Sequence, residues 1–447
     1  LVLMAEEYFD VVIVGAGLSG IGAAWHLQDK CPDKSYLILE GRESMGGTWD
    51  LFRYPGIRSD SDMYTLGYKF KPWREGKAIA DGPSILKYIR ETAAEANIEQ
   101  NIRYQHAVSA ASWSSEDAEW TVEVQDSATD ETITIGCGFL LMCAGYYNYE
   151  QGYLPEFKGY DNFRGETVHP QHWPEDLDYS DKKVIIIGSG ATAVTLVPEM
   201  AKKARHVVML QRSPTYMGSA PDTDWLAQLL RWLLPEKTAY AITRWKNINY
   251  QRWIYWQAKK SPNYIRNKLL KMARKDLGKN VDFEKHFVPN YDPWDQRLCL
   301  VPNGDFFHAV RDGHASIVTD TIDEFTENGI RLESGQQLEA DIIVTATGLD
   351  LRVLGDVNIS VDDRPIDLSK TFSYKSMMFS DVPNLVSTFG YINASWTLKA
   401  DLTAEFSCRL LNHLAATGMR QCTPRLQEHE REMAGEDWIE GFSSGYI

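Results

Sequence analysis

The stretch Val11-Val-Ile-Val-Gly-Ala-Gly-Leu-Ser-Gly20 decides the fold of the N-terminal part of the chain. Its four β-branched residues suit a strand that is buried on both faces, and residues 21–27 suit a helix that leaves the turn. Between strand and helix, Gly15 allows a tight turn, Gly17 lets a pyrophosphate approach the backbone, and Gly20 allows close helix packing. We therefore predict a dinucleotide-binding fold.

An acidic residue ends the next predicted strand. Ser35-Tyr-Leu-Ile-Leu-Glu40 follows the glycine turn at the distance where a ribose 2′-hydroxyl needs a hydrogen-bond acceptor. FAD and NAD both carry a free hydroxyl at this position. The first fold is therefore predicted to bind FAD or NAD through Gly15, Gly17, Gly20 and Glu40.

A second strand, glycine turn and helix are predicted from Val184-Ile-Ile-Ile-Gly-Ser-Gly-Ala-Thr-Ala193. The strand that follows, at 207–212, carries no acid at its end and has Arg212 and Ser213 there instead. A cation at this position suits a 2′-phosphate, which favours NADP. The predicted NADP contacts are Gly188, Gly190, Ala193, Arg212 and Ser213.

Two stretches outside the glycine turns are expected to contact a flavin. After Glu40, the segments 46–49 and 54–60 contain glycine and proline, which suits backbone that passes close to a ligand. Near the other end, Ser395 is expected to cap a helix over 396–414, and a helix N-terminus stabilises the negative charge of a reduced flavin ring. The expected flavin contacts are Gly47, Thr48, Trp49, Asp60 and Ser395.

Further elements follow from hydrophobic periodicity. We predict a helix at 85–96, a hairpin of strands 120–124 and 132–135, a separate buried strand at 139–145, and a strand at 342–348 that crosses back toward the first fold.

Composition narrows the class of protein. The chain has 447 residues and a net charge of -16, which argues against nucleic-acid binding because nucleic acids need a basic surface. Its six cysteines are scattered without a CxxC pair, and its ten histidines form no metal-binding motif. No apolar run is long enough to span a bilayer, and no signal-like segment is visible. We therefore expect a cytoplasmic protein with reduced thiols and no metal.

Residues 222–279 form a helical, aromatic insert whose charge differs from that of the whole chain. This stretch has 13 lysines and arginines against 4 aspartates and glutamates, and it contains five tryptophans. One interpretation is a weak contact with an anionic membrane surface. The simpler interpretation, which we favour at this point, is a lid over the active site whose aromatic side chains belong to the core or to the pocket wall.

Two longer patterns resemble the signatures of a known enzyme family. One is Gly46-Gly-Thr-Trp49 with Tyr54-Pro-Gly56 and Asp60, and the other is Phe163-x-Gly165-x-x-x-His169-x-x-x-Trp173-Pro174. Both resemble the signatures of type I Baeyer-Villiger monooxygenases, over essentially the whole chain. Within that family the sequence is most similar to the ethionamide-activating monooxygenases.

The resemblance implies a chemistry and two catalytic residues. NADPH reduces FAD, the reduced flavin reacts with O2, and a C4a-peroxyflavin converts a ketone to an ester or lactone or oxygenates sulfur in a thio compound. The catalytic arginine of the family matches Arg297, whose cation stabilises the developing negative charge, and the acid that pairs with it matches Asp60. Many relatives carry a lysine where this chain has Gln296, so NADPH selection is expected to depend more on Arg212 and Ser213. Relatives also continue past the position of Ile447.

Together these patterns predict an α/β fold with two Rossmann-like dinucleotide-binding domains, for FAD and for NADP, and a helical insert in the NADP domain. The expected plan is an FAD-binding domain at 5–150 and 375–447, a linker at 151–182, an NADP-binding domain at 183–221 and 280–348, the insert at 222–279, and a return linker at 349–374.

Three alternatives remain at the level of sequence. A flavin monooxygenase that oxygenates only nitrogen or sulfur would share both folds and both cofactors. A pyridine nucleotide-disulfide reductase would need a redox cysteine pair, and the sequence has no CxxC. A non-catalytic NADPH-sensing protein would keep the fold without using Asp60 and Arg297. The oligomeric state is not predicted.

Overall fold

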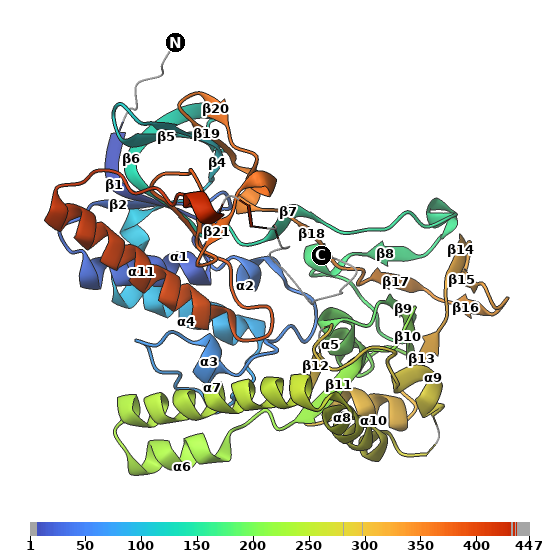
Figure 1. The fold of residues 1–447 in the computed structure, drawn as a ribbon. Coiled ribbons are helices and arrows are strands. Elements are labelled where there is room, and N and C mark those ends of the chain that lie inside the picture. The colour runs from blue at the N-terminus through green and yellow to red at the C-terminus, as the bar shows by residue number, and fades with distance from the viewer. Residues whose placement is uncertain (1–6, 280, 297, 431, 434, 436–447) are drawn as a thin grey trace.

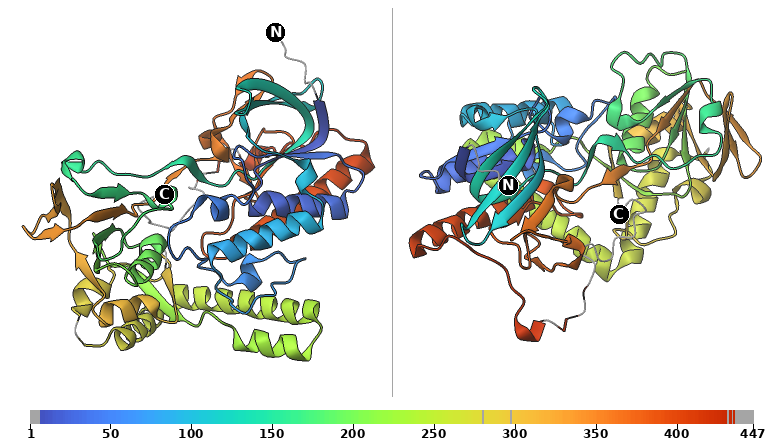
Figure 2. Two further views of the ribbon diagram at one scale, coloured as in Figure 1. Left: turned by 180° about the vertical axis from the view of Figure 1, so that it is seen from behind. Right: turned by 90° about the horizontal axis from the view of Figure 1, so that it is seen from above.

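Two α/β units lie side by side in the computed structural model, and a pair of helices runs along the lower edge of Figure 1. The structure describes residues 7–279, 281–296, 298–430, 432–433 and 435. The chain passes between the two units twice. The two connecting segments contain β7 (Tyr147–Gly152) and β18 (Leu349–Leu351), which pair as antiparallel strands. Figure 2 shows the same separation of the two units from behind and from above.

The first unit is built on a nine-stranded sheet with the order β20-β19-β4-β5-β6-β1-β2-β3, in which β23 also pairs with β6. Its strands are β1 (Glu7–Val14), β2 (Tyr36–Leu39), β3 (Ile102–Arg103), β4 (His106–Ser114), β5 (Glu119–Asp126), β6 (Glu131–Met142), β19 (Asn358–Val361), β20 (Arg364–Pro365) and β23 (Leu385–Ser387). Strands β1, β2, β3 and β23 join it by parallel pairing, as a dinucleotide fold requires.

Helices cover one face of this parallel region. Helices α1 (Leu18–Lys30), α4 (Gly82–Glu95) and α11 (Trp396–Thr417) lie beneath the sheet in Figure 1. Val11 and Ile13 pack toward them, whereas Val12 and Val14 pack on the other face with Trp113 and other apolar side chains. The predicted β-branched run is thus buried on both faces, because successive side chains point to opposite sides of a strand. Two short helices, α2 (Thr48–Leu51) and α3 (Met63–Leu66), lie in the loops that follow β2.

One predicted pair of strands is a single strand in the structure. Residues 132–135 and 139–142 belong to the continuous strand β6, which we expected as a hairpin arm and a separate buried strand. The first half of β6 pairs antiparallel with β5, and its second half also pairs parallel with β1 and β23. The hydrophobic periodicity of the sequence changes along β6 because its partner strands change. The sequence pattern therefore indicated two strands where the structure has one.

The second unit contains a five-stranded parallel sheet with the order β13-β10-β9-β17-β8. Its strands are β8 (Glu166–Val168), β9 (Lys183–Ile187), β10 (His206–Gln211), β13 (Ala315–Thr319) and β17 (Ile342–Thr345), and its helices are α5 (Ala191–Met200), α9 (Phe283–Phe287) and α10 (Asp305–Arg311). Two smaller sheets accompany it, formed by β11 (Tyr216–Ala220) with β12 (Leu298–Pro302), and by β14 (Ile322–Thr326), β15 (Gly329–Leu332) and β16 (Gln337–Glu339).

The insert folds into three helices, α6 (Trp225–Leu233), α7 (Glu236–Lys260) and α8 (Pro262–Leu277). In the part of the chain that the structure describes, no helix has both the length and the mean hydropathy of a transmembrane helix. We expected the aromatic side chains of the insert to belong to the core or to a pocket wall. This prediction is wrong for the tryptophans, since all five of them are exposed: Trp225, Trp232, Trp245, Trp253 and Trp256.

The return segment does more than connect the units. We expected 349–374 to be a linker, but its strands β19 and β20 extend the sheet of the first unit, with β19 parallel to β4. A short hairpin of β21 (Ser373–Tyr374) and β22 (Met378–Phe379) follows. Edge pairing of this kind satisfies backbone groups that would otherwise be open on β4.

Candidate active site

The first glycine turn is closed tightly by its own backbone. Gly15 has a φ of +103°, and a Cβ atom there would lie 2.5 Å from the carbonyl oxygen of Cys143. A Cβ atom at Gly20 would lie 1.9 Å from the carbonyl oxygen of Gly15. Gly17 precedes α1 at its N-cap and faces Gly47, because a Cβ atom at Gly17 would lie 3.6 Å from the Cα atom of Gly47. The two glycines thus form a narrow, side-chain-free cradle at a helix N-terminus, which fits a pyrophosphate.

Glu40 supports this cradle from the end of β2. Its Oε2 atom accepts a hydrogen bond from the Ala16 N–H at 2.7 Å, and its Oε1 atom accepts one from the Arg42 N–H at 3.0 Å. The residue is 7% exposed, and burial raises the pKa of its carboxyl group above the ordinary value, while the two donated N–H groups oppose that rise. The sequence predicted a ribose acceptor here, and the structure adds that the same carboxylate holds the glycine turn in place.

A buried carboxylate that the sequence reasoning missed lies just behind the Gly46-Gly47 turn. Asp50 is buried, and its carboxylate lies 2.9 Å from Arg42 Nη2 and 3.1 Å from Arg90 Nη2. This ion-pair cluster ties α2 to α4 and to the segment after β2, because a buried carboxylate requires charged partners. Arg90 lies forty residues beyond Asp50 in the sequence, and the three residues follow no motif that could have identified them.

Two tyrosines of β7 also belong to this cradle. The Tyr147 hydroxyl lies 2.6 Å from Thr48 Oγ1, and the hydroxyl of Tyr149 approaches the positions where Cβ atoms of Gly47 and Gly145 would lie, at 3.4 and 3.2 Å. Burial raises the pKa of Tyr149 to about 12, so its hydroxyl stays protonated and can donate to an anion. Neither tyrosine was predicted as a site residue from the sequence.

The N-terminus of α11 lies next to the first glycine turn. Trp396 Nε1 donates a hydrogen bond to Ser19 Oγ at 2.8 Å, and the Trp396 ring stacks on Tyr146 with a centroid distance of 5.3 Å. Ser395 occupies the N-cap position, as predicted, but its side chain does not cap the helix. Its Oγ atom pairs with Thr65 Oγ1 at 2.6 Å instead, so the serine joins α11 to α3.

The segment that carries the first signature lies between the two units. Phe52, Tyr54 and Ile57 pack in the core of the second unit, and a Cβ atom at Gly56 would lie 3.0 Å from the Cβ atom of Glu199 on α5. Arg58 forms an ion pair with Asp305 of the second unit at 2.5 Å. This segment therefore holds the two units together.

The two expected catalytic residues are only partly covered by the structure. Asp60 is exposed at the end of the same segment. Arg297 lies outside the described residues, so its pairing with Asp60 stays a prediction. Trp49 is half-buried and packs against the cores of both units, at the start of α2.

The second glycine turn is more open than the first. Gly188 has a φ of +131° and lies against the Ala346 backbone, but a Cβ atom at Gly190 would have no other atom within 4 Å. Gly190 precedes α5 at its N-cap, and Ala193 is fully buried behind it. Backbone N–H groups at an open helix N-terminus fit a pyrophosphate.

Arg212 and Ser213 follow β10, where the sequence placed them. Both are exposed, and the Ser213 carbonyl oxygen accepts a hydrogen bond from Ser189 Oγ at 3.4 Å. This bond brings the end of β10 to the second glycine turn. The structure therefore brings the predicted NADP contacts together at one edge of the sheet.

The second signature lies beside the crossing between the units. His169 Nδ1 accepts a hydrogen bond from the Gln171 N–H at 3.2 Å, and Gln171 Nε2 donates to the carbonyl oxygen of Asn148 on β7 at 2.7 Å. A Cβ atom at Gly152 would lie 1.9 Å from His169 Cε1, so only glycine fits there. Burial lowers the pKa of His169 below its ordinary value. The histidine thus lies at the junction of both crossings.

Comparison with known proteins places this geometry in a family. The model of the flavin-binding monooxygenase-like family matches residues 79–414, and a model of the NAD(P)-binding Rossmann-like domain matches residues 13–73. The first match covers most of the chain. It confirms the prediction of a flavin-dependent monooxygenase.

Curated relatives agree over nearly the full length. The FAD-containing monooxygenase EthA of Mycobacterium tuberculosis (strain ATCC 25618 / H37Rv) is 56% identical over 413 residues, which cover 92% of this chain and 84% of the relative. The probable FAD-binding monooxygenase AlmA of Acinetobacter baylyi (strain ATCC 33305 / BD413 / ADP1) is 50% identical over 444 residues, covering 99% and 88%.

Solved structures share the fold at low identity. A steroid monooxygenase bound to NADP has a TM-score of 0.78 at 22% identity, covering 93% of this chain and 87% of that structure. An open structure of cyclohexanone monooxygenase has a TM-score of 0.80 at 19% identity, covering 95% and 91%. These matches confirm the predicted α/β fold with two dinucleotide units. The chain therefore belongs to the flavin-binding monooxygenase-like family.

Proposed function

We propose that this protein is an NADPH- and O2-dependent monooxygenase that holds FAD in its first unit and NADP in its second. The observation that carries the proposal is the pair of glycine cradles with opposite chemistry at the following strand ends, Glu40 in one and Arg212 in the other. A carboxylate accepts the free ribose hydroxyls of FAD, and a guanidinium binds the 2′-phosphate that distinguishes NADP from NAD. The relatives named as FAD-containing and the solved structure with NADP support the same assignment.

The first unit provides a rigid and largely enclosed cofactor site. Gly17 and Gly47 leave room for the pyrophosphate, and Glu40 holds the turn while accepting from ribose. Thr48 and Tyr147 form one hydrogen-bonded wall. The N-terminus of α11 supplies oriented N–H dipoles that stabilise a negative charge on the reduced ring.

The reaction proposed is the insertion of one oxygen atom beside a ketone carbonyl, which gives an ester or lactone. When bound, the reduced flavin supplies the activation of O2. Arg297 is proposed to place a permanent cation beside the reacting oxygen, since a guanidinium stays protonated where a lysine ammonium can lose its proton. Asp60 is proposed to orient that guanidinium. The site then has to exclude water, and the packing of 52–58 against the second unit contributes to that exclusion.

Oxygenation of sulfur is the second activity proposed, because the sequence resembles the ethionamide-activating enzymes and matches EthA over 92% of its length. The sulfur of a thioamide or sulfide is a nucleophile and would need an electrophilic, protonated oxygen donor. The carbonyl carbon of a ketone is an electrophile and would need a nucleophilic, deprotonated one. Both substrates are apolar and can share one pocket.

The test offers the FAD-loaded protein a ketone and a sulfide in parallel, with NADPH and isotope-labelled oxygen gas. We expect one labelled atom in the ester and one in the sulfoxide, each formed in proportion to NADPH consumed. Sulfoxide without ester would restrict the protein to sulfur oxygenation. NADPH consumption that yields only hydrogen peroxide would contradict a monooxygenase, and no consumption would indicate an NADPH-sensing protein.

A variant separates the cofactor proposal from the chemical one. Arg297→Ala is expected to keep NADPH-dependent bleaching of the flavin but to lower ester formation at least about a hundredfold. Gln296→Ala serves as a matched control at the neighbouring position and is expected to retain most ester formation. Unchanged ester formation by Arg297→Ala would remove this residue from the reaction.

A further inference from the structure

The helical hairpin formed by α6 and α7 exposes tryptophans that an ordinary surface helix would bury. The side of α7 that faces the first unit is polar. Arg244 is buried there and donates from Nη1 to the carbonyl oxygens of Tyr64 at 2.8 Å and Gly67 at 2.7 Å. Asn247 and Gln251 both donate hydrogen bonds to the buried carboxylate of Asp62. The helix is therefore anchored to the protein by its polar residues.

The opposite side of α7 is rich in aromatic side chains. Trp245, Trp253 and Trp256 recur at helical spacing on the side away from Arg244, and Trp245 is 69% exposed. Surface helices of globular proteins normally bury such residues and expose their charged ones. Here the tryptophans are exposed together with Arg252 and Lys260, which marks the outer side of α7 as a surface with a partner.

Helix α6 extends this apolar surface. It lies on the far side of α7 from the body of the protein (Figure 1), and Trp225, Leu229 and Trp232 share its outer face. Trp225 is 73% exposed and Trp232 is 82% exposed. So many exposed tryptophans on two neighbouring helices are unusual on a protein that has no partner for them.

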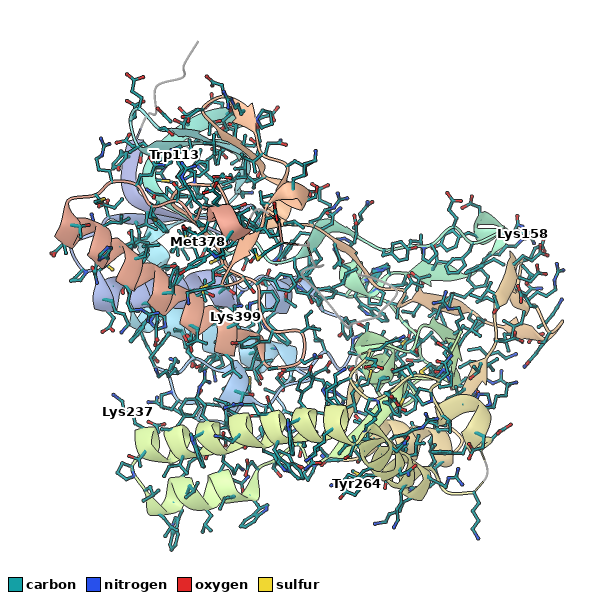
Figure 3. All side chains as sticks on the ribbon, in the orientation of Figure 1. Trp113, Lys158, Lys237, Tyr264, Met378 and Lys399 are labelled. Atoms are coloured by element: carbon teal, nitrogen blue, oxygen red, sulfur yellow. The ribbon has the colours of Figure 1, made fainter. Side chains whose placement is uncertain are left out.

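Basic side chains accompany these aromatic rings. Lys260 Nζ lies 4.6 Å from the centroid of the Trp256 ring, and Arg252 lines a shallow hollow with Asn249 and Trp253 on the same helix. Helices α6 and α7 together have seven lysines and arginines against one acidic residue, in a chain of net charge -16. In Figure 3, Lys237 and Tyr264 mark the beginning of α7 and the region just after its end, with side chains projecting from the helices between them.

We propose that the outer face of the α6–α7 hairpin docks on an anionic lipid surface. Tryptophan, leucine and lysine or arginine together are the composition of helices that lie in the plane of a membrane interface, because the indole ring suits the headgroup level and the cations attract anionic lipids. The hairpin protrudes along one edge of the molecule (Figure 1), which lets it reach a flat surface.

A second copy of the chain fits this face less well. Two hairpins packed face to face would bring two basic surfaces together, and like charges repel. Packing against another part of the chain would need an apolar acceptor. Among the described residues, all exposed tryptophans lie on α6 and α7, and the exposed apolar side chains elsewhere are scattered. A lipid surface satisfies both the apolar and the basic part of the hairpin.

The experiment is co-sedimentation of the FAD-loaded protein with vesicles of phosphatidylcholine alone, or of equal parts phosphatidylcholine and phosphatidylglycerol. We expect a partition coefficient at least about tenfold higher for the anionic vesicles, which falls when the salt concentration is raised. The tryptophan fluorescence is expected to shift to the blue on binding. Equal partition into both vesicles, or none into either, would overturn the proposal.

Matched variants test the face itself. Trp225→Ser with Trp232→Ser, and Trp256→Ser with Lys260→Glu, are each expected to lower binding to anionic vesicles at least about tenfold while flavin content stays unchanged. The control is Tyr374→Ser with Lys375→Glu at the end of β21, where the lysine lies over the tyrosine ring at 5.5 Å, as Lys260 lies over Trp256. The control is expected to bind like the unchanged protein. Equal loss of binding in the control would overturn the assignment to the hairpin, as would hairpin variants that bind vesicles normally but dissociate a dimer in light scattering.

Discussion

The two glycine turns follow nearly the same sequence pattern, but the chain closes around them to different degrees. At the first turn, Glu40 is 7% exposed and bonds to the turn backbone, and Gly17 faces a second glycine at position 47. At the second turn, a side chain at Gly190 would meet no atom within 4 Å, and Arg212 is exposed. The first glycine turn is therefore enclosed by neighbouring residues, whereas the second glycine turn is open to solvent.

This difference suits two kinds of cofactor. An enclosed cradle keeps a cofactor through many turnovers, because release requires several contacts to break together. An open helix N-terminus with an exposed cation binds through phosphate charges and lets the nucleotide leave after each hydride transfer. We therefore expect FAD to remain bound and NADP to exchange. Three measurements test this comparison, and a fourth tests the junction between the two units.

The largest effect is expected from Gly20→Ala in the first turn. The added Cβ atom would lie 1.9 Å from the Gly15 carbonyl oxygen, so backbone has to move. We expect a loss of about 3 kcal/mol of unfolding free energy and of most bound flavin, measured by thermal melting and by flavin absorbance per protein. The equivalent position of the second turn already holds alanine, and Ala193→Gly should cost only about 1 kcal/mol. Full flavin content in Gly20→Ala would show that the first cradle is not closed.

A smaller loss is expected from Glu40→Gln. The amide can accept only one of the two backbone N–H bonds and turns an NH2 group toward the other, which costs about 2 kcal/mol. Thermal melting with and without added FAD should show a lower midpoint that extra FAD partly restores. Glu116→Gln, at an exposed turn of the same unit, is the control and should melt like the unchanged protein. An unaltered midpoint in Glu40→Gln would argue against the bracing role of Glu40.

Arg212→Ala sharpens the comparison at the second turn. Loss of the guanidinium should raise KM for NADPH about tenfold, equivalent to about 1.4 kcal/mol, and leave KM for NADH and the flavin content unchanged. Steady-state kinetics with both nucleotides measure this. Arg205→Ala, just before the opposite end of β10, is the matched control. A parallel rise of both KM values would mean that Arg212 does not read the 2′-phosphate.

The smallest effect concerns the junction between the two units. Burial lowers the pKa of His169 from its ordinary value of 6.5, so the unfolded chain binds more protons than the folded one between those two pKa values. Stability should therefore fall as the pH drops below about 6.5, and less so in His169→Gln. Thermal midpoints across this pH range measure the difference between the two proteins. Parallel curves for both would remove His169 as the titrating group.

Local patterns were sufficient for the parts of the fold that are continuous in sequence. Both glycine turns, the strands before them and the helices after them lie where the sequence predicted, because a β-branched run and a glycine turn specify their own backbone. The charges at the two strand ends were also visible, since Glu40 and Arg212 directly follow their strands. The family signatures also singled out His169 and the segments 46–49 and 54–60, whose contacts with a flavin stay a prediction.

Only the tertiary structure decided which distant residues meet. The Asp50 carboxylate with Arg42 and Arg90, and Thr48 with Tyr147, join separate segments. The Ser395 hydroxyl pairs with Thr65 rather than capping its own helix, because that partner comes within reach only after folding. The exposure of the tryptophans in the insert also depends on contacts between segments that are distant in sequence. The sequence showed that the insert is rich in tryptophan, but it did not show which side of α7 is buried. That side is determined by the hydrogen bonds of Arg244, Asn247 and Gln251 with polar groups of the first unit.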